Sequence, residues 1–169
     1  MGAHRHENFC TFPGGLDIST SNEMEVQWKL LMPSEARFLA VVRAAVGELG
    51  SVYGWPEPDC QGVILAVDEA VANIIRHAYH GSHDGAIEVN CRAGTDRLEF
   101  TLLDQGDPPD LQRICSQPLD DHAHGGRGTH LIRMIMDEVS YERVPSGNRL
   151  RLSKRLPAGA CTEKEGSDA

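Results

Sequence analysis

The sequence has no apolar run of the roughly 18 residues that a membrane-spanning helix requires. Its longest apolar segments are residues 62–67 and 38–46, and Arg43 interrupts the second. The first ten residues include His, Arg and Glu and lack the apolar stretch of a secretory signal. Basic residues are in deficit: 16 Lys and Arg against 25 Asp and Glu leave a net charge of −9, unlike a general nucleic-acid binder. We therefore expect a cytoplasmic protein with no direct contact to membrane or nucleic acid.

The sequence also lacks the cysteine and histidine patterns of common metal centres. Five cysteines without a C-x-x-C pair argue against a disulfide framework and a structural zinc site. They are Cys10, Cys60, Cys91, Cys115 and Cys161. His77, His80 and His83 recur every third residue, which could suit a metal, but H-E-x-x-H is absent and residues 80–85 resemble a loop. We predict reduced thiols and no histidine metal centre.

A chain of 169 residues, 40% of them hydrophobic, is long enough for one globular domain with its own core. We expect a flexible arm over residues 1–22, the domain over 23–156 and a disordered tail over 157–169. Hydrophobic periodicity predicts the elements of the domain. The predicted strands are 23–32, 86–92, 97–104, 139–144 and 149–156, and the predicted helices are 59–78, 129–137 and one that opens at Pro33-Ser34 and is broken at 53–56. The long polar connection 105–124 is typical of a functional or disordered loop.

The helix predicted over residues 59–78 has two different faces. At about 100° per residue, valines and isoleucines gather on one side, while Glu69, Asn73 and His77 recur every fourth residue on the other. Arg76 also falls on that side, about 20° from Glu69. Such a stripe is commonly the solvated face of a helix. A carboxylate and an amide one turn apart can also hold a divalent cation and a hydroxyl group, and the helix alone leaves both interpretations open.

Two glycine-containing turns follow downstream. Asp104-Gln105-Gly106 leaves a predicted strand, and residues 125–129 (Gly-Gly-Arg-Gly-Thr) come directly before a predicted helix. Glycines ahead of a helix let backbone N–H groups approach a phosphate, and the helix N-terminus adds a favourable potential. The cluster is neither a Walker A loop, since no Gly-Lys-Ser/Thr follows, nor a dinucleotide fingerprint, since the third glycine is missing. Taken alone, such a cluster is more often a simple helix cap.

Together, three segments resemble one family. Residues 68–79 resemble the N-box of the GHKL ATPase superfamily, and more narrowly that of the anti-sigma-factor serine-protein kinases of bacterial partner-switching systems. Asp104-Gln105-Gly106 resembles their first glycine box and residues 126–139 their second, in the family's order, between Met24 and Leu156. The resemblance implies an α+β fold: a two-layer α/β sandwich of the Bergerat or histidine kinase-like ATPase type. Its sheet would be mixed and mostly antiparallel, with helices on one face.

The resemblance also implies a role for each matched residue near the metal and the base. Asn73 would coordinate Mg²⁺ bridging the phosphates of ATP, and Glu69 would act as general base toward a serine hydroxyl. Asp104 would accept a hydrogen bond from the adenine amino group, and Gly106 would let the backbone pass close to the base. These roles agree with a reaction that depends mainly on positioning and charge neutralisation.

The second glycine box would serve the phosphates in the same way. Gly126 and Gly128 would cradle them, with Arg127 beside them in a lid. The nucleotide-binding set implied by the resemblance is completed by His77, Thr129 and Asn148.

Three positions depart from the family pattern. Pro108 stands where the first glycine box often has a second glycine, and His124 stands where some members carry an arginine. Asn148 replaces the threonine expected after the glycine of the last hairpin, Gly147. Because Asn148 keeps hydrogen-bonding groups, we expect nucleotide binding to persist, and the departures bear more on phosphoryl transfer.

The favoured function is an ATP-dependent protein-serine kinase and anti-sigma factor that phosphorylates a serine of a STAS-type anti-anti-sigma protein. One alternative is a non-catalytic switch that uses ATP only to set its conformation; it would need Asn73 and the glycines but not Glu69. Another is a detached histidine-kinase catalytic domain, which we expect less because the first 22 residues are too few for dimerisation helices with a phosphoacceptor histidine. The expected cofactors are ATP and Mg²⁺. The expected partners are a STAS-domain protein, a sigma factor and a second copy of the chain.

Overall fold

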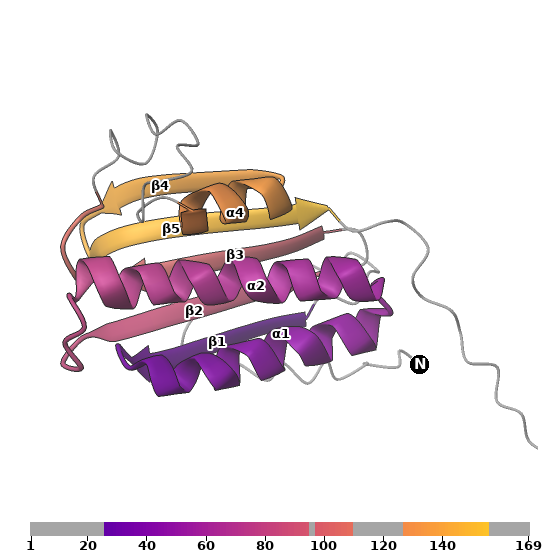
Figure 1. The fold of residues 1–169 in the computed structure, drawn as a ribbon, viewed down its shortest axis with the longest axis horizontal. Helices are drawn as coiled ribbons and strands as arrows, with labels where there is room; N and C mark the ends of the chain where they lie inside the picture. The colour runs from indigo at the N-terminus through magenta and orange to yellow at the C-terminus, as the bar shows by residue number, and fades with distance from the viewer. Residues whose placement is uncertain (1–25, 95–96, 110–126, 156–169) are drawn as a thin grey trace, which may run out of the picture.

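The computed structural model describes residues 26–94, 97–109 and 127–155 as a five-stranded sheet with helices layered on one face (Figure 1). The strands are β1 (Val26–Pro33), β2 (Ala86–Ala93), β3 (Arg97–Asp104), β4 (Glu138–Val144) and β5 (Gly147–Arg155). The helices are α1 (Leu39–Tyr53), α2 (Glu57–Asn73) and α4 (Arg127–Ile135). A 3-10 turn, Ala36–Phe38, precedes α1, and a π-helical turn, Ile74–Ala78, continues α2. The strand order is β1-β2-β3-β5-β4.

The elements predicted from hydrophobic periodicity are confirmed over the described residues, with bounds that differ by a few positions. The two-layer α+β sandwich is confirmed as well. Each pairing between the described strands is antiparallel, so the sheet is not mixed as the resemblance implied. The expected arm 1–22, the expected tail 157–169 and residues 110–124 of the polar connection lie outside the described residues. Within the described ranges, no helix combines the length and apolar character needed to cross a membrane.

The start of the first helix was predicted too early. Strand β1 continues through Pro33, which pairs with Ala86 at the edge of β2. The hydroxyl group of Ser34, a buried residue, donates to the carbonyl of Ser82 at 2.6 Å and accepts from the backbone N–H of Gly85 at 3.1 Å. Ser34 therefore ties β1 to the loop before β2 rather than capping a helix.

Strand β3 sends alternate side chains into the core. Leu98, Phe100 and Leu102 are fully buried, whereas the residues between them are only half-buried. The same alternation makes Asp104 the next inward position, and this carboxylate is 7% exposed. The period of the strand thus carries one acidic side chain into the interior at the end of an apolar row.

Helix α2 packs between α1 and α4 (Figure 1). Val63, Val67 and Val71 on its inner side have no exposed surface. Gly50 of α1 allows close approach on one flank, since a Cβ there would overlap the Sγ atom of Cys60. Contacts on several sides therefore set the rotation of α2 about its axis.

Two of the five cysteines lie in the described core. Cys60 and Cys91 are free and buried. Burial raises the pKa of the Cys91 thiol to about 12, and it also raises the pKa of Cys60. The prediction of reduced thiols is confirmed for these two. Cys10, Cys115 and Cys161 lie outside the described residues.

Substitution of Phe100 tests the described packing of the core. It is fully buried in the central strand and meets Trp28 edge-on, with 6.2 Å between ring centroids. We expect Phe100→Ala to lower the free energy of unfolding by about 3–5 kcal/mol because it leaves a cavity. In the control Val52→Ala, at a side chain 70% exposed, the change should stay within about 0.5 kcal/mol. Urea denaturation measures both, and equal midpoints would contradict the described packing.

Candidate functional site

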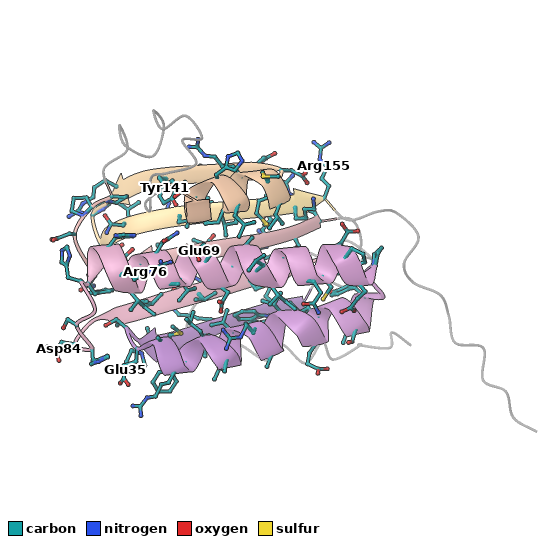
Figure 2. All side chains as sticks on the ribbon, viewed as in Figure 1. Glu35, Glu69, Arg76, Asp84, Tyr141 and Arg155 are labelled. Carbon is teal, nitrogen blue, oxygen red and sulfur yellow. The ribbon has the colours of Figure 1, made fainter. Side chains whose placement is uncertain are left out.

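Three polar side chains meet at the end of α2 and its π-helical turn. The Nη2 atom of Arg76 lies 2.7 Å from Oε1 of Glu69 and 3.2 Å from Oδ1 of Asn73. Its Nε atom donates to the carbonyl of Ala72 at 3.2 Å. Glu69 and Arg76 lie close together along this helix (Figure 2). A carboxylate oxygen and an amide oxygen therefore converge on one cationic group.

The π-helical turn changes which side chains share the polar face predicted for this helix. The backbone N–H of Tyr79 donates to the carbonyl of Ile74 at 3.2 Å, five residues back, and such turns are wider than α-helical ones. Glu69 and Asn73 keep their predicted neighbourhood. Arg76 joins them, whereas His77 is exposed at the surface. Arg76 was not among the predicted site residues, although its spacing of three from Asn73 and seven from Glu69 was a signal for this contact.

The loop after β3 is fastened to the same helix end. The backbone N–H of Asp107 donates to the carbonyl of Ala78 at 2.9 Å, and that of Gln105 donates to the Tyr79 hydroxyl at 3.0 Å. Gly106 packs so closely that a Cβ there would lie 2.5 Å from the carbonyl oxygen of Ala78. The first glycine motif and the helix motif therefore form one connected surface, and a side chain at position 106 would separate them.

The buried carboxylate of Asp104 is the centre of a hydrogen-bond network. Its Oδ1 atom accepts from the backbone N–H of Gly106 at 2.9 Å and from Nδ2 of Asn148 at 2.8 Å. Burial raises the pKa of Asp104, against the opposing effects of these two bonds and of the nearby Arg143 charge. A buried acid with two fixed donors on one oxygen is an oriented hydrogen-bonding group.

Asn148 is 6% exposed, and its side chain is already engaged within the protein. Besides Asp104, its Nδ2 atom lies 3.1 Å from the carbonyl of Gly106 and 3.3 Å from that of Asp107. Its Oδ1 atom accepts from Nη1 of Arg143 at 2.7 Å. Asn148 therefore holds Asp104 and the loop in place. Its direct contact with a nucleotide stays a prediction.

The hairpin glycine before Asn148 was not among the predicted site residues. Gly147 has a φ of 132°, a backbone conformation that favours glycine, and a Cβ there would overlap the carbonyl oxygen of Asp104. Its place between two strands was the sequence signal for a tight turn. The requirement for glycine comes from the close passage of β5 beside the end of β3.

The second glycine motif reaches the helix at Glu69. A Cβ on Gly128 would overlap the Glu69 carboxylate, so the first turn of α4 rests directly on this side chain. Thr129 follows in the same turn and is half-buried. Arg127 is the first residue of α4, and Gly126 lies outside the described residues. The structure thus brings Glu69, Asn73 and Gly128 to one place, with Gly106 and the Asp104 network on the loop attached to the same helix end.

The histidines show a different arrangement from a metal centre. The Nε2 atom of His80 lies 2.9 Å from Oδ2 of Asp107, on the surface. Over the described residues, no group of three or more His, Cys, Asp or Glu side chains is arranged to hold a metal ion. A metal at this end of the molecule would depend on Asn73 together with oxygen atoms of a ligand.

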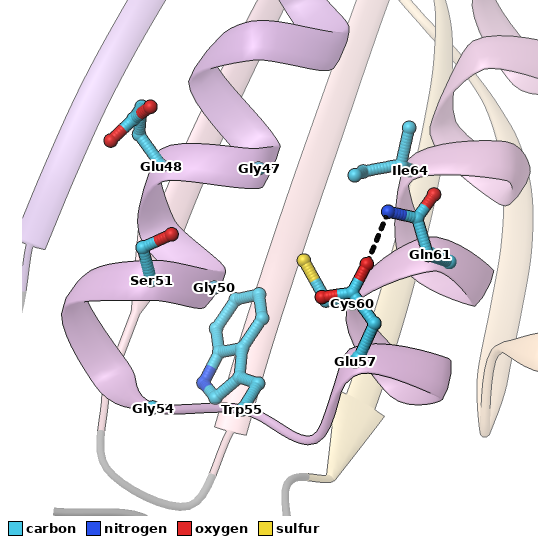
Figure 3. A pocket seen from close by; sticks show the side chains of 10 residues that line it. All are labelled: Gly47, Glu48, Gly50, Ser51, Gly54, Trp55, Glu57, Cys60, Gln61 and Ile64. Carbon is cyan, nitrogen blue, oxygen red and sulfur yellow. Dashed lines mark hydrogen bonds between the residues drawn. The ribbon is translucent and has the colours of Figure 1, made fainter.

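A cavity of about 370 Å³ lies at the other end of α2 (Figure 3). Its lining comes from the end of α1 and the start of α2 and includes Ser51, Trp55, Glu57 and Gln61. Glu57 accepts a hydrogen bond from Gln61 at 2.7 Å. None of the predicted site residues lines this cavity, so it is separate from the candidate site.

Comparison with known proteins gives consistent matches. Residues 32–154 match the histidine kinase-like ATPase domain. The serine-protein kinase RsbW of Bacillus velezensis is 29% identical over 76% of this chain and 84% of that protein. The RsbW proteins of Bacillus subtilis and Listeria innocua are 26% and 30% identical, over 76% and 65% of this chain and 84% and 75% of their own lengths.

One solved structure shares the fold. It contains the RsbU and RsbW domains of a Mycobacterium tuberculosis protein and superposes with a TM-score of 0.57 at 19% sequence identity. The match covers 79% of this chain and 34% of that longer chain. At this level of identity the likeness supports the two-layer architecture alone.

The network around Asp104 predicts a pH-dependent effect of substitution. Asp104→Asn keeps an oxygen for both donors and removes the buried charge. Because the pKa of Asp104 is raised above its ordinary value of 3.8, the native protein binds this proton more tightly than the unfolded chain. The contribution of Asp104 to stability is therefore largest below that value and is lost as pH rises through the raised pKa. Urea unfolding between about pH 4 and pH 7 should show the Asn variant gaining on the parent as pH rises.

The matching control is Asp104→Ala, which leaves the Gly106 and Asn148 donors without this acceptor. It should cost about 1–3 kcal/mol of unfolding free energy. A difference between the parent and the Asn variant that does not change with pH would contradict the described environment.

Proposed function

The chain belongs to the histidine kinase-like ATPase domain family, and from this premise we propose that it is an ATP-dependent protein-serine kinase and anti-sigma factor of a partner-switching system. Its proposed substrate is a serine of a STAS-type anti-anti-sigma protein. The observation that carries the proposal is the convergence of Glu69, Asn73 and Gly128 at one helix end. The RsbW relatives, which are serine-protein kinases by name, support the same reaction.

Asp104 is the residue proposed to recognise the adenine base. Both of its recorded hydrogen bonds end on Oδ1, and a carboxylate held in one orientation can accept from an exocyclic amino group. Asn148 and Gly106 would fix that orientation, and the close fit of Gly106 against Ala78 would keep the backbone near the base. A guanine presents a carbonyl oxygen at the equivalent position, which the carboxylate would repel.

The side-chain oxygen atoms at the end of α2 are suited to bind a divalent cation. Asn73 Oδ1 and Glu69 Oε1 already share one positive group, the Arg76 guanidinium, and hard oxygen ligands of this kind suit Mg²⁺. Asn73 is the proposed protein ligand of Mg²⁺, which when bound would neutralise charge on the phosphates of ATP. Gly128 in the first turn of α4 would offer backbone N–H groups to the phosphates. The proposed roles of Gly126, Arg127, Thr129 and His77 beside them follow from the family resemblance.

Glu69 is the proposed general base. Its side chain is 25% exposed and lies against Gly128, where the phosphates are proposed to bind. The carboxylate would take the proton of the serine hydroxyl as the hydroxyl oxygen bonds to the γ-phosphorus. The bond from the γ-phosphorus to the β,γ-bridging oxygen breaks, and ADP leaves with that oxygen. A non-catalytic switch would need no base here, so the placement of Glu69 favours the kinase over that alternative.

We propose that the domain spans residues 23–156 and that it works in the cytoplasm, where the STAS-domain protein is its substrate. A sigma factor and a second copy of the chain are the other proposed partners. The order of these contacts would be set by the bound nucleotide.

Asn73→Ala tests the nucleotide site. Removing the amide oxygen should weaken binding of ATP in the presence of Mg²⁺ by at least about tenfold, which is about 1.4 kcal/mol. Asn90→Ala is the control, because Asn90 lies on β2 and its side chain bonds Glu88 at 2.9 Å, away from the site. Isothermal titration calorimetry measures both.

Asp104→Asn should in the same assay lose its preference for ATP over GTP. Unchanged affinity in both site variants would remove the nucleotide site from the proposal.

Glu69→Gln tests the reaction itself. The substitution keeps shape and helix propensity while it removes the basic oxygen, so ATP binding should stay near that of the parent. Transfer of radiolabelled γ-phosphate to STAS proteins of the same genome should slow by at least about a hundredfold. Glu57→Gln, at the other end of α2, should transfer like the parent. If the parent binds ATP but labels no STAS protein, the non-catalytic switch replaces the kinase; if the Gln variant transfers at the parent's rate, Glu69 is not the base.

A further inference from the structure

Arg76 is a charged residue at the candidate site that the proposed reaction does not use. It belongs to the π-helical turn, and its guanidinium contacts three acceptors: Glu69 Oε1 at 2.7 Å, Asn73 Oδ1 at 3.2 Å and the carbonyl of Ala72 at 3.2 Å. A single nitrogen, Nη2, makes both side-chain contacts. The guanidinium therefore lies between the proposed base and the proposed metal ligand.

These contacts compete with the chemistry assigned to the same atoms. The Asn73 oxygen would have to face Mg²⁺, and the Glu69 oxygen would have to face a serine hydroxyl. A guanidinium 3.2 Å from the one and 2.7 Å from the other would crowd both and repel a second cation. This arrangement is therefore incompatible with the proposed Mg²⁺ and serine contacts unless Arg76 moves.

We propose that Arg76 is a positioning residue that takes the place of the cation in the nucleotide-free site. It keeps the Glu69 carboxylate and the Asn73 amide turned toward one point, and it is displaced when Mg²⁺ and ATP bind together. This inference rests on the proposed function, since it assigns a state of the same site. Its consequence is a threshold: binding of ATP requires enough Mg²⁺ to replace an internal cation.

The position of Arg76 makes this displacement feasible. Its side chain is 55% exposed, and exposed ion pairs are weak because water competes for both partners. A comparable pair lies one residue away on α2: Arg43 of α1 contacts Asp68 at 2.7 Å, with 46% of its side chain exposed. Asp68 is not part of the proposed site. Arg43 therefore provides a control with the same side chain and a similar exposure.

The main experiment measures the Mg²⁺ dependence of ATP binding by the full chain. Calorimetric titrations of ATP are repeated over a series of Mg²⁺ concentrations for the parent, Arg76→Gln, Arg76→Lys and Arg43→Gln. We expect Arg76→Gln to reach half of its maximal affinity at about fivefold lower Mg²⁺ than the parent, in line with loss of one exposed charge contact. Arg76→Lys, which keeps the charge, and Arg43→Gln should follow the parent.

A second measurement follows the guanidinium directly. The side-chain Nε–H signal of Arg76, identified by its absence in Arg76→Gln, should be visible by NMR in the free protein because it donates to Ala72. It should shift or disappear on addition of ATP with Mg²⁺, and stay unchanged with Mg²⁺ alone at the same concentration. Turnover at saturating Mg²⁺ and ATP should change less than about threefold in Arg76→Gln, since the residue is displaced in the loaded enzyme.

Each contrary result has its own meaning. If ATP binding by Arg76→Gln needs more Mg²⁺ than that of the parent, or if the variant loses turnover at saturating Mg²⁺ and ATP, Arg76 binds the nucleotide. The proposal that Arg76 takes the place of the cation is then wrong. If Arg76→Gln behaves like Arg43→Gln, the contact is an ordinary surface ion pair and the inference fails while the kinase proposal stands. If the parent shows no Mg²⁺-dependent ATP binding, the proposed function itself fails, and this inference with it.

Discussion

Helix α2 can be seated in this protein in only one rotation, because its inner side is fully buried and its flanks contact both neighbouring helices. Val63, Val67 and Val71 have no exposed surface, and a turn about the helix axis would bring polar residues into their place at a cost of several kcal/mol. The opposite side is thereby aimed at the first turn of α4, where Gly128 meets the Glu69 carboxylate. The contacts of Glu69, Asn73 and Arg76 depend on this seating.

The alternation of side chains along β3 explains why an acid is buried at the end of that strand. Asp104 occupies an inward position only because three apolar residues before it share that face. The cost of burying it appears as a raised pKa, and two donors on one oxygen offset part of that cost. A carboxylate without these donors would be a poor interior residue. With them Asp104 is a buried acceptor held in one orientation, which supports its proposed contact with an amino group.

The glycines of the motifs meet packing requirements that are independent of their proposed role toward a nucleotide. Gly106 fits against the carbonyl of Ala78, Gly128 against Glu69, and Gly147 against the carbonyl of Asp104. Each joins a loop or helix end to the element beside it, so that the nucleotide would meet a surface assembled before it binds. This is preorganisation in a physical sense: the groups that would contact the ligand are already held by contacts with one another.

Much of this could be predicted from the sequence, because hydrophobic periodicity is local. The strand and helix order, the neighbourhood of Glu69 and Asn73, and the glycine turn after β3 all follow from residues within a few positions of each other. Only the tertiary structure decided the rest. The bond between Asp104 and Asn148 joins residues 44 positions apart and depends on the antiparallel register of β3 and β5, and the contact of Gly128 with Glu69 depends on how α4 lies on α2. The Arg76 pairing was within reach of the sequence, since an α-helical wheel already puts Arg76 near Glu69, but the π-helical turn that carries Arg76 was not. Local patterns are set by the covalent chain, whereas register and helix seating are set by the burial of surfaces that are distant in the chain.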